Sequence, residues 1–319
     1  MKKRRMLKII TIVLVCSFGF TGMAFAAQKK VVIAEQSWSG SIAISNIMKY
    51  VLENELDVPV DIVQMAPALT WPSLDRGDVD VFSDVWWPNQ DAGVQKYVKE
   101  RKTVEMTLSY EDAPQGWYIP TWVAEKYGIR SYKDINKHTE LFDITGDGKG
   151  DIWAGGYGWM GSEITKIQVR DLGVDLEPYV VDVWVFLTQL KEAMRTDRPM
   201  IFYYWEPEWP FAVYDLSEIE LPPYEDSKWT YVEKRMDESS ITCGWKPAQV
   251  YVGYGTKLQK KSPKTYRFFK QWYIPIDEVS FLIAELEDIP GNPKKDVEEV
   301  VEEWVRDHPA IVNDWIKGI

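Results

Sequence analysis

Tryptophan residues stand at three places in this sequence where a strand pattern ends or a helix pattern begins. These places are Trp86 in residues 77–88, Trp159 in residues 155–162 and Trp205 in residues 202–209. An indole ring attracts a cation through its π face, and each well-placed ring contributes about 0.5–2 kcal/mol. A quaternary ammonium has no N–H to donate, so a cage of aromatic rings suits it. The pattern therefore predicts that the three rings converge within about 6 Å of one point and hold such a cation.

Each of these segments also has a structural interpretation. Neighbouring strand residues face opposite ways, so we expect one ring of Trp86 and Trp87 to enter a cleft and the other to pack; alternatively, both pack. The glycines around Trp159 let the backbone approach a ligand, and free N–H groups at a helix start favour an anion. The alternative there is a tight strand-to-helix turn with a core tryptophan. Trp38 and Trp117 are additional candidates for ligand contact.

Residues 143–151 have the spacing of part of a calcium-binding loop. The residues at positions 1, 3, 5 and 9 of that spacing are Asp143, Thr145, Asp147 and Asp151, with Gly148 at the turn. The twelfth position, normally an acidic bidentate ligand, is Ala154. A polar loop capped by its own aspartates is the favoured interpretation, with calcium as the alternative. We therefore expect no metal site and no cofactor.

The elements that must position these residues alternate between strands and helices. Periodicity predicts strands over residues 31–34, 58–65, 79–85, 200–204 and 246–254, and helices over residues 41–55, 162–172, 183–195, 262–272 and 293–307. Such alternation indicates an α/β fold with mainly parallel strand pairing, in which ligands bind beyond the carboxyl ends of the strands.

Two domains are expected, because roughly 290 residues exceed the usual size of a single core. We expect one lobe from residues 27–112 plus 248–319 and the other from residues 113–247. Residues 221–237 are charged and irregular, which predicts a surface excursion.

The first 26 residues have the order of a secretory signal peptide. A basic segment (1–8) precedes an apolar run (9–20), and small residues end at Ala26, where cleavage is expected. The apolar run is too short to span a bilayer comfortably. Cys16 would permit lipoprotein processing, but Val15 is larger than the residue that this processing favours. The expected location is the periplasm, without a lipid anchor.

The charge of the chain excludes several classes of partner. Loss of the leader lowers Lys+Arg from 37 to 32 against 49 Asp+Glu, which leaves a net charge of −17. So acidic a chain is a poor ligand for nucleic acid and for anionic membrane surfaces. Only Cys243 remains as a cysteine, so no internal disulfide can form. Two histidines leave little room for histidine-based catalysis.

At these residues the sequence resembles the substrate-binding proteins of glycine betaine/proline betaine ABC transporters and, more distantly, their choline-binding relatives. The resemblance covers nearly the whole chain after the leader and is carried by residues 77–88, 127–135, 141–151, 158–163 and 202–209. It implies a type II periplasmic-binding fold, in which two α/β lobes close on the ligand about a hinge. It also implies a cage of Trp86, Trp159 and Trp205, an ABC permease with ATPase subunits as partners, and a monomeric receptor.

The resemblance further implies that the ligand carboxylate meets the backbone N–H groups of Met160 and Gly161. Gram-negative betaine binders have a histidine four residues after the first cage tryptophan, where this chain has Gln90, which can donate a neutral hydrogen bond. Choline binders have an acid two residues beyond their first aromatic residue, where Gly40 follows Trp38. The absence of an acid at Gly40 argues against choline as the preferred ligand, whereas Gln90 in place of histidine gives the carboxylate a weaker, neutral hydrogen bond.

Two other classes of function compete with this interpretation. A secreted carbohydrate hydrolase would use paired acids, but exposed acids are the default in a chain with 49 of them. The sequence also has no Gly-x-Ser-x-Gly elbow and no His-Glu-x-x-His motif, so we expect no enzyme. A binding module that serves a sensor is the other alternative, and neighbouring genes for an ATPase and a permease would exclude it.

Overall fold

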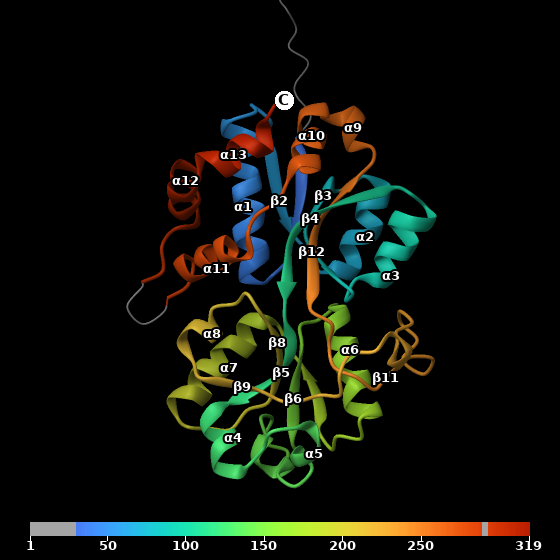
Figure 1. The fold of residues 1–319 in the computed structure, drawn as a ribbon, viewed down its shortest axis with the longest axis vertical. Coiled ribbons are helices and arrows are strands. Elements are labelled where there is room, and N and C mark those ends of the chain that lie inside the picture. The colour runs from blue at the N-terminus through green and yellow to red at the C-terminus, as the bar shows by residue number, and fades with distance from the viewer. Residues whose placement is uncertain (1–29, 289–292) are drawn as a thin grey trace, which may run out of the picture.

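The computed structural model describes residues 30–288 and 293–319, which form two lobes, one above the other in Figure 1. Each lobe is built on a five-stranded sheet that is flanked by helices. The expected signal peptide and Cys16 lie outside the described residues. Within the described part of the chain, no helix is long and apolar enough to cross a membrane.

Lobe 1, the upper lobe in Figure 1, contains both the first and the last described segments of the chain. Its sheet has the spatial order β2 (Val60–Gln64), β1 (Val31–Glu35), β3 (Val81–Trp87), β12 (Ala248–Gly255) and β4 (Val104–Ala113). Its helices are α1 (Ser39–Asn54), α2 (Pro67–Arg76), α3 (Asp91–Gly93), the π-helix η1 (Val94–Glu100), α9 (Leu258–Lys261), α10 (Pro263–Gln271), α11 (Ile276–Glu285), α12 (Val297–Asp307) and α13 (Pro309–Ile316).

Lobe 2 repeats the strand pattern of lobe 1. Its sheet has the order β7 (Glu177–Val180), β6 (Asp151–Gly155), β8 (Phe202–Trp205), β5 (Gln115–Pro120) and β9 (Leu216–Glu218). Its helices are α4 (Thr121–Tyr127), α5 (Tyr132–Ile135), η2 (Thr139–Phe142), α6 (Met160–Asp171), α7 (Val183–Arg195), α8 (Pro210–Val213) and η3 (Asp226–Lys228). A small hairpin of β10 (Trp229–Thr230) and β11 (Ser240–Ile241) lies within the segment predicted as a surface excursion and its continuation.

The expectation of mainly parallel pairing is wrong for half of the strand pairs in the two five-stranded sheets. In lobe 1, β1 pairs in parallel with β2 and β3, but β12 is antiparallel to both β3 and β4. In lobe 2, β6 is parallel to β7 and β8, whereas β5 is antiparallel to β8 and β9. The antiparallel strands β4, β5 and β12 adjoin the connections between the lobes, so they do not follow the strand–helix–strand crossovers that produce parallel pairs.

Hydrophobic burial on both faces of the lobe 1 sheet fixes the positions of its strands. One face packs against α1, whose buried residues include Ile44, Met48 and Val51 at helical spacing. On the other face, the Trp71 ring of α2 lies between Phe82 and Tyr97, with ring centroids 5.5 Å and 5.9 Å away. Both faces of the sheet are thus covered by packed side chains, and β3 runs between them toward lobe 2.

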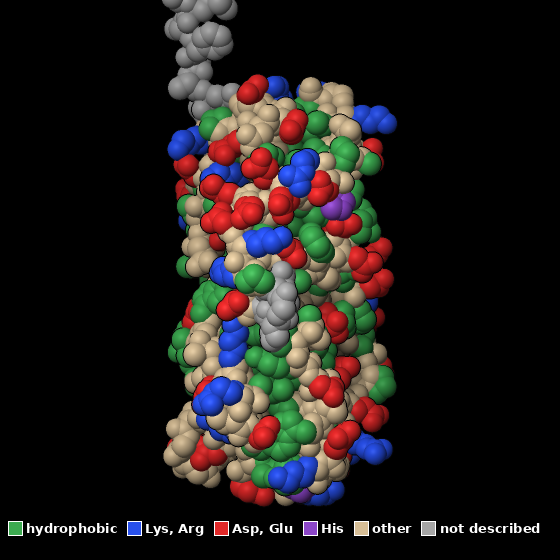
Figure 2. All heavy atoms as spheres, turned by 90° about the vertical axis from the view of Figure 1, so that its left-hand side faces the viewer, with side chains coloured by type: hydrophobic (Ala, Val, Ile, Leu, Met, Phe, Trp, Pro, Cys, Tyr) green, Lys and Arg blue, Asp and Glu red, His purple; other side chains and the backbone are tan. Residues whose placement is uncertain are grey.

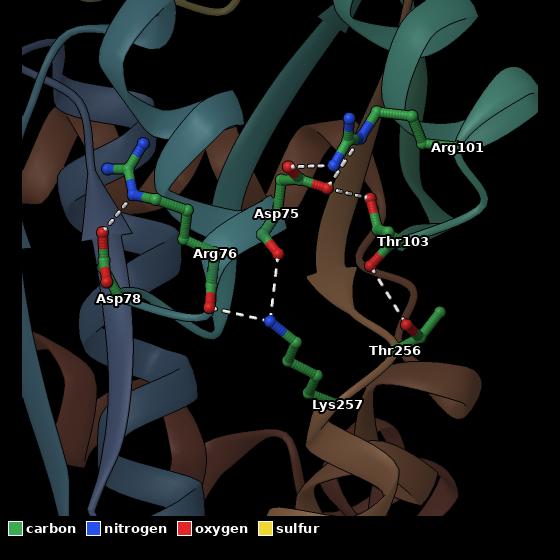
Figure 3. Close-up of polar contacts among 7 residues, drawn as sticks. All are labelled: Asp75, Arg76, Asp78, Arg101, Thr103, Thr256 and Lys257. Carbon is green, nitrogen blue, oxygen red and sulfur yellow. Dashed lines mark hydrogen bonds and ion pairs between the residues drawn. The ribbon is translucent and has the colours of Figure 1, made fainter.

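A group of polar contacts joins the C-terminal end of α2 to the residues next to β4 and β12, at the end of lobe 1 away from lobe 2. Figure 3 shows them among Asp75, Arg76, Asp78, Arg101, Thr103, Thr256 and Lys257. Lys257 Nζ donates to the main-chain oxygens of Asp75 and Arg76 at 3.2 Å and 2.8 Å, which places a cation at the C-terminal end of α2. Hydrogen bonds from Thr103 and Arg101 hold the pKa of Asp75 below its usual value. These contacts stabilise the lobe away from the cleft.

Charged and hydrophobic side chains are distributed unevenly over the surface. Figure 2 shows many acidic and basic side chains over the upper lobe, whereas hydrophobic side chains gather along the middle of the lower lobe. At the start of α7, Trp184 and Val185 are 40% and 48% exposed.

Candidate ligand-binding site

A small pocket of about 30 Å³ lies between the lobes, and half of its lining residues are aromatic. Its lining residues are Trp38, Pro67, Trp86, Asn89, Gln90, Trp159, Met160, Gly161, Tyr203 and Trp205. The first five belong to lobe 1 and the last five to lobe 2. A wall that is mainly apolar, with a few polar groups, is typical of pockets for small organic ligands.

Four indole rings meet in this pocket. The ring centroid of Trp205 lies 5.4 Å from that of Trp159, 6.1 Å from that of Trp86 and 6.4 Å from that of Trp38. Trp38 and Trp159 are 5.3 Å apart, and all four pairs meet edge to face. The structure thus brings together the three tryptophans singled out in the sequence, and Trp38 joins them as a fourth ring.

The local structure explains how the lobe 1 rings reach the pocket. Trp38 is the residue directly before α1, and Trp86 lies on β3, which continues through Trp87 and so extends further than predicted. Trp87 faces the other way: Lys246 Nζ lies 5.1 Å from its ring centroid, and its Nε1 donates to Asp91 at 3.1 Å. One of the two adjacent rings therefore enters the pocket and the other does not.

Asp84 lies behind the two lobe 1 rings and was missed by the sequence reasoning. Its Oδ2 accepts hydrogen bonds from Trp38 Nε1 at 2.5 Å and Trp86 Nε1 at 2.9 Å. Its Oδ1 accepts one from the Tyr110 hydroxyl at 3.2 Å. Burial raises the pKa of Asp84 to about 6, although the three hydrogen bonds oppose that rise. The sequence held one clue to this contact: Asp84 stands two residues before Trp86, and residues two apart on a strand share a face.

The first turn of α6 forms the opposite part of the wall. Its first two residues are Met160 and Gly161, and within the described residues neither backbone N–H has a hydrogen-bond acceptor. The residue before the helix, Trp159, makes no side-chain cap. A Cβ on Gly161 would lie 3.1 Å from the Tyr203 hydroxyl, so glycine lets that ring approach closely. Two N–H groups at a helix start form a site that suits an anion.

Gln90 contributes an amide group from lobe 1. Its Oε1 accepts a hydrogen bond from Trp71 Nε1 at 2.9 Å. An indole N–H can only donate, so the amide oxygen must face Trp71, and the NH₂ group remains as a donor. The side chain is buried in the pocket wall. Gln90 is thus positioned to donate a hydrogen bond to a ligand.

Asn89 links the lobes and was also missed by the sequence reasoning. Its Nδ2 donates to Gln115 Oε1 at 2.6 Å, and Gln115 Nε2 donates back to Asn89 Oδ1 at 3.1 Å. The Tyr203 hydroxyl joins this pair by donating to Gln115 Oε1 at 2.7 Å. Amide and hydroxyl groups carry no distinctive sequence pattern, so the network could be found only in three dimensions.

Other candidate residues lie away from the pocket. Trp117, proposed as an additional ligand contact, is fully buried in the core of lobe 2 on β5 and does not line the pocket. In the loop with calcium-like spacing, Asp143 accepts hydrogen bonds from the N–H groups of Gly146, Asp147 and Gly148. Asp151 accepts from Ile144 and Thr145. The carboxylates of this loop thus cap its own backbone.

Two carboxyl groups, one from each lobe, meet at the start of α1. Glu208 of lobe 2 is buried there, facing Glu287 of lobe 1, and its Oε1 has no hydrogen-bond partner. Burial, together with the nearby carboxyl groups of Glu287 and Asp84, raises the pKa of Glu208 well above its usual value, and Gly40 and Ser39 partly offset this. The Ser39 hydroxyl donates to Glu287 at 2.9 Å.

Comparison with known proteins identifies the family. The model of the substrate-binding domain of ABC-type glycine betaine transport systems matches residues 29–307. The chain belongs to this family. Members are solute-binding components of transporters and not enzymes, so the predicted family and the predicted absence of enzymatic function are both confirmed.

Curated relatives are distant in sequence but extensive in coverage. The glycine betaine/proline betaine-binding periplasmic protein of Escherichia coli K12 is 21% identical over 260 residues, which is 77% of this chain and 76% of that protein. The glycine betaine-binding periplasmic protein OusX of Dickeya dadantii is 22% identical over 263 residues, 78% of this chain and 77% of that protein. The relatives are thus periplasmic binding proteins.

Solved structures confirm the predicted two-lobed periplasmic-binding fold. The lactococcal OpuAC structure, closed on glycine betaine, matches with a TM-score of 0.71 at 19% identity and covers 91% of this chain and 100% of that chain. An ABC-transporter choline-binding protein in complex with choline matches with a TM-score of 0.74 at 20% identity, over 91% of this chain and 92% of that chain.

Proposed function

We propose that this protein is the extracytoplasmic receptor of an ABC importer, and that it binds glycine betaine or a related quaternary-ammonium osmolyte and delivers it to the permease. The observation that carries the proposal is the meeting of four indole rings from both lobes in one pocket, with centroid separations of 5.3–6.4 Å. A trimethylammonium group fits such a site because it gains cation–π attraction and needs no hydrogen-bond acceptor. Curated relatives that bind glycine betaine support this choice.

The opposite end of the pocket suits a carboxylate. The N–H groups of Met160 and Gly161 at the start of α6 would donate to it, and the helix dipole adds a favourable potential. Gln90 would donate from lobe 1, so the carboxylate would bridge the lobes. A ligand with a cation and an anion a few ångströms apart matches both ends, whereas choline, with a neutral hydroxyl, matches only one.

The assignment of residues to lobes forms part of the proposal. Residues 27–112 plus 248–319 form lobe 1, and residues 113–247 form lobe 2, so the hinge lies at the two crossings between them. In support, the chain changes sheet between β4 and β5, and Ala113 is paired with Ala248 at the start of β12, which places the two crossings side by side. The rings touch one another across the pocket, so ligand entry requires the lobes to move apart.

The proposal also covers where the protein acts, in what oligomeric state and with which partners. Residues 1–26 are the signal peptide, the mature receptor acts in the periplasm as a monomer, and its partners are the ABC permease and its ATPase subunits. Small-angle scattering tests the hinge and the oligomeric state together. A mass equal to one chain and a smaller radius of gyration with saturating glycine betaine are expected, and no contraction would contradict the hinge.

A calorimetric panel tests the function itself. Glycine betaine, proline betaine, carnitine, choline and dimethylsulfoniopropionate are titrated into the mature protein under identical conditions. The proposal predicts saturable binding of at least one betaine, with choline weaker than glycine betaine, and recovery of the ligand unchanged. Absence of binding by every quaternary ammonium in the panel would contradict the proposal.

A further inference from the structure

Asp84 is a buried carboxyl group shared by three elements of lobe 1. It lies on β3 with 1% of its surface exposed. Its donors are Trp38, at the start of α1; Trp86, on β3; and Tyr110, on β4. Two of these donors are the indole N–H groups of rings that form the pocket wall. The carboxyl group therefore lies directly behind the aromatic surface that would face a ligand.

The surroundings of Asp84 supply no positive charge. Among the described residues, no lysine, arginine or histidine forms an ion pair with it, and no cation contributes to the shift of its pKa. Burying a carboxylate without a counter-ion is costly, and three neutral donors offset only part of that cost. A carboxylate placed in this way is stabilised when a cation enters the adjacent pocket.

We propose that Asp84 determines the selectivity of the pocket for a cation: it orients the indoles of Trp38 and Trp86, and its negative charge favours a quaternary ammonium group over a neutral group of the same shape. This inference rests on the proposed function, because it concerns the same pocket. The four rings alone recognise a bulky, weakly hydrated group, which a tert-butyl group would imitate well. A unit charge a few ångströms behind the rings distinguishes the two by on the order of tenfold or more in affinity.

The same arrangement predicts how binding depends on pH. A bound cation favours the ionised form of Asp84, so its pKa falls on binding, and the affinity for glycine betaine rises with pH through the region near 6 before levelling off. The titratable groups that face Asp84 are Tyr110 and, from lobe 2, Glu208, which in turn faces Glu287. Glu208→Gln therefore serves as the control that separates the two buried acids.

The test compares glycine betaine with 3,3-dimethylbutanoate, in which a carbon atom replaces the ammonium nitrogen and the carboxylate is unchanged. Dissociation constants are measured at pH 7.5 by calorimetry, and by competition for the weaker ligand. Asp84→Asn, which keeps the shape of the side chain, is expected to weaken glycine betaine about tenfold or more while changing 3,3-dimethylbutanoate less than twofold. Tyr110→Phe removes a donor but no charge, and should leave the ratio of the two affinities near that of the wild type.

The outcomes separate this inference from the proposed function. If the wild type binds glycine betaine and Asp84→Asn weakens both ligands by the same factor, Asp84 is only structural and the inference is overturned. Wild-type protein that binds neither ligand would overturn the proposed function as well. A titration of the wild type from pH 5.5 to 7.5 needs no Asp84 variant: rising affinity that persists in Glu208→Gln supports the inference, and a flat profile contradicts it.

Discussion

The two lobes hold their halves of the pocket by different means. In lobe 1, the indole N–H groups of Trp38 and Trp86 are hydrogen-bonded to Asp84, and the Gln90 amide is hydrogen-bonded to Trp71. In lobe 2, Trp205 Nε1 has no partner, and the ring is held by stacking on Tyr204, with centroids 4.5 Å apart. Lobe 1 therefore fixes its rings by directional polar contacts, whereas lobe 2 fixes this ring by packing.

This contrast extends through the whole of lobe 2. Within the described residues, the buried side-chain polar atoms without a hydrogen-bond partner all belong to lobe 2; they are Trp117 Nε1, Gln168 Oε1, the Tyr204 hydroxyl, Trp205 Nε1, Glu208 Oε1, Trp209 Nε1 and Trp245 Nε1. Unpaired buried groups each cost about 1–3 kcal/mol, and native proteins contain few of them. The two rings of lobe 1 thus have a buried carboxyl group as their polar partner, whereas Trp205 of lobe 2 lies in a region where several buried polar atoms have no partner.

Removal of a whole ring should have the largest effect, and the effect should be similar from either lobe. Trp86→Ala and Trp205→Ala are each expected to weaken glycine betaine binding by about 1–3 kcal/mol, because each removes a π face from the cation. Calorimetry on both variants measures this loss. Unchanged affinity in either variant would show that its ring is not part of the site.

Replacement of the same two tryptophans by phenylalanine should destabilise the two lobes to different extents. Trp86→Phe keeps an aromatic face but removes a hydrogen bond to the buried Asp84, which should lower the free energy of unfolding by about 1.5–3 kcal/mol. Trp205→Phe removes an N–H that has no partner, so only the smaller ring area is lost. Denaturant unfolding of both variants gives the difference. Equal destabilisation would contradict the contrast between the lobes.

The buried Glu208 of lobe 2, whose Oε1 has no hydrogen-bond partner, should make the stability of the protein depend on pH. Its pKa is raised in the folded protein, so the folded form holds a proton that the unfolded form releases, and stability is lost as pH rises above the ordinary glutamate value. Glu208→Gln should remove this loss and raise Tm by about 2 °C or more at pH 7.5, with little change at pH 4. Thermal unfolding at both pH values measures it, with the exposed Glu299→Gln as the control. A lower Tm at pH 7.5 would mean that the ionised carboxylate stabilises α1.

The smallest expected effect concerns the donor from lobe 1. Gln90→Ala should weaken glycine betaine by about 1 kcal/mol, because a hydrogen bond to the carboxylate is lost, and should weaken choline by less. Titration of both ligands into the variant and the wild type gives the two losses. Equal losses would place Gln90 outside the carboxylate site.

Much of the fold could be predicted because its elements have strong local patterns. The helix predicted over residues 183–195 coincides with α7, and the predicted strands near residues 31, 58, 79, 200 and 246 match β1, β2, β3, β8 and β12 within a few residues. The antiparallel pairing could not be predicted, because it depends on where the chain crosses between lobes and not on the pattern within any one strand.

The site was predictable only in part, for a similar reason. Trp86, Trp159 and Trp205 were recognisable as aromatic residues at the ends of elements, and all three line the pocket. Asp84 looked like any other acid in a strongly acidic chain. Its burial depends on donors that are 46 and 26 residues away in the sequence, at Trp38 and Tyr110, which meet it only in the folded lobe.

A crystal structure of the protein with glycine betaine would locate both ends of the bound ligand. We expect the trimethylammonium group within about 6 Å of the ring centroids of the pocket tryptophans. We also expect the ligand carboxylate about 2.7–3.2 Å from the backbone nitrogens of Met160 and Gly161. Glycine betaine bound outside this pocket, or bound in it with the carboxylate among the rings and the ammonium group at the start of α6, would contradict this expectation.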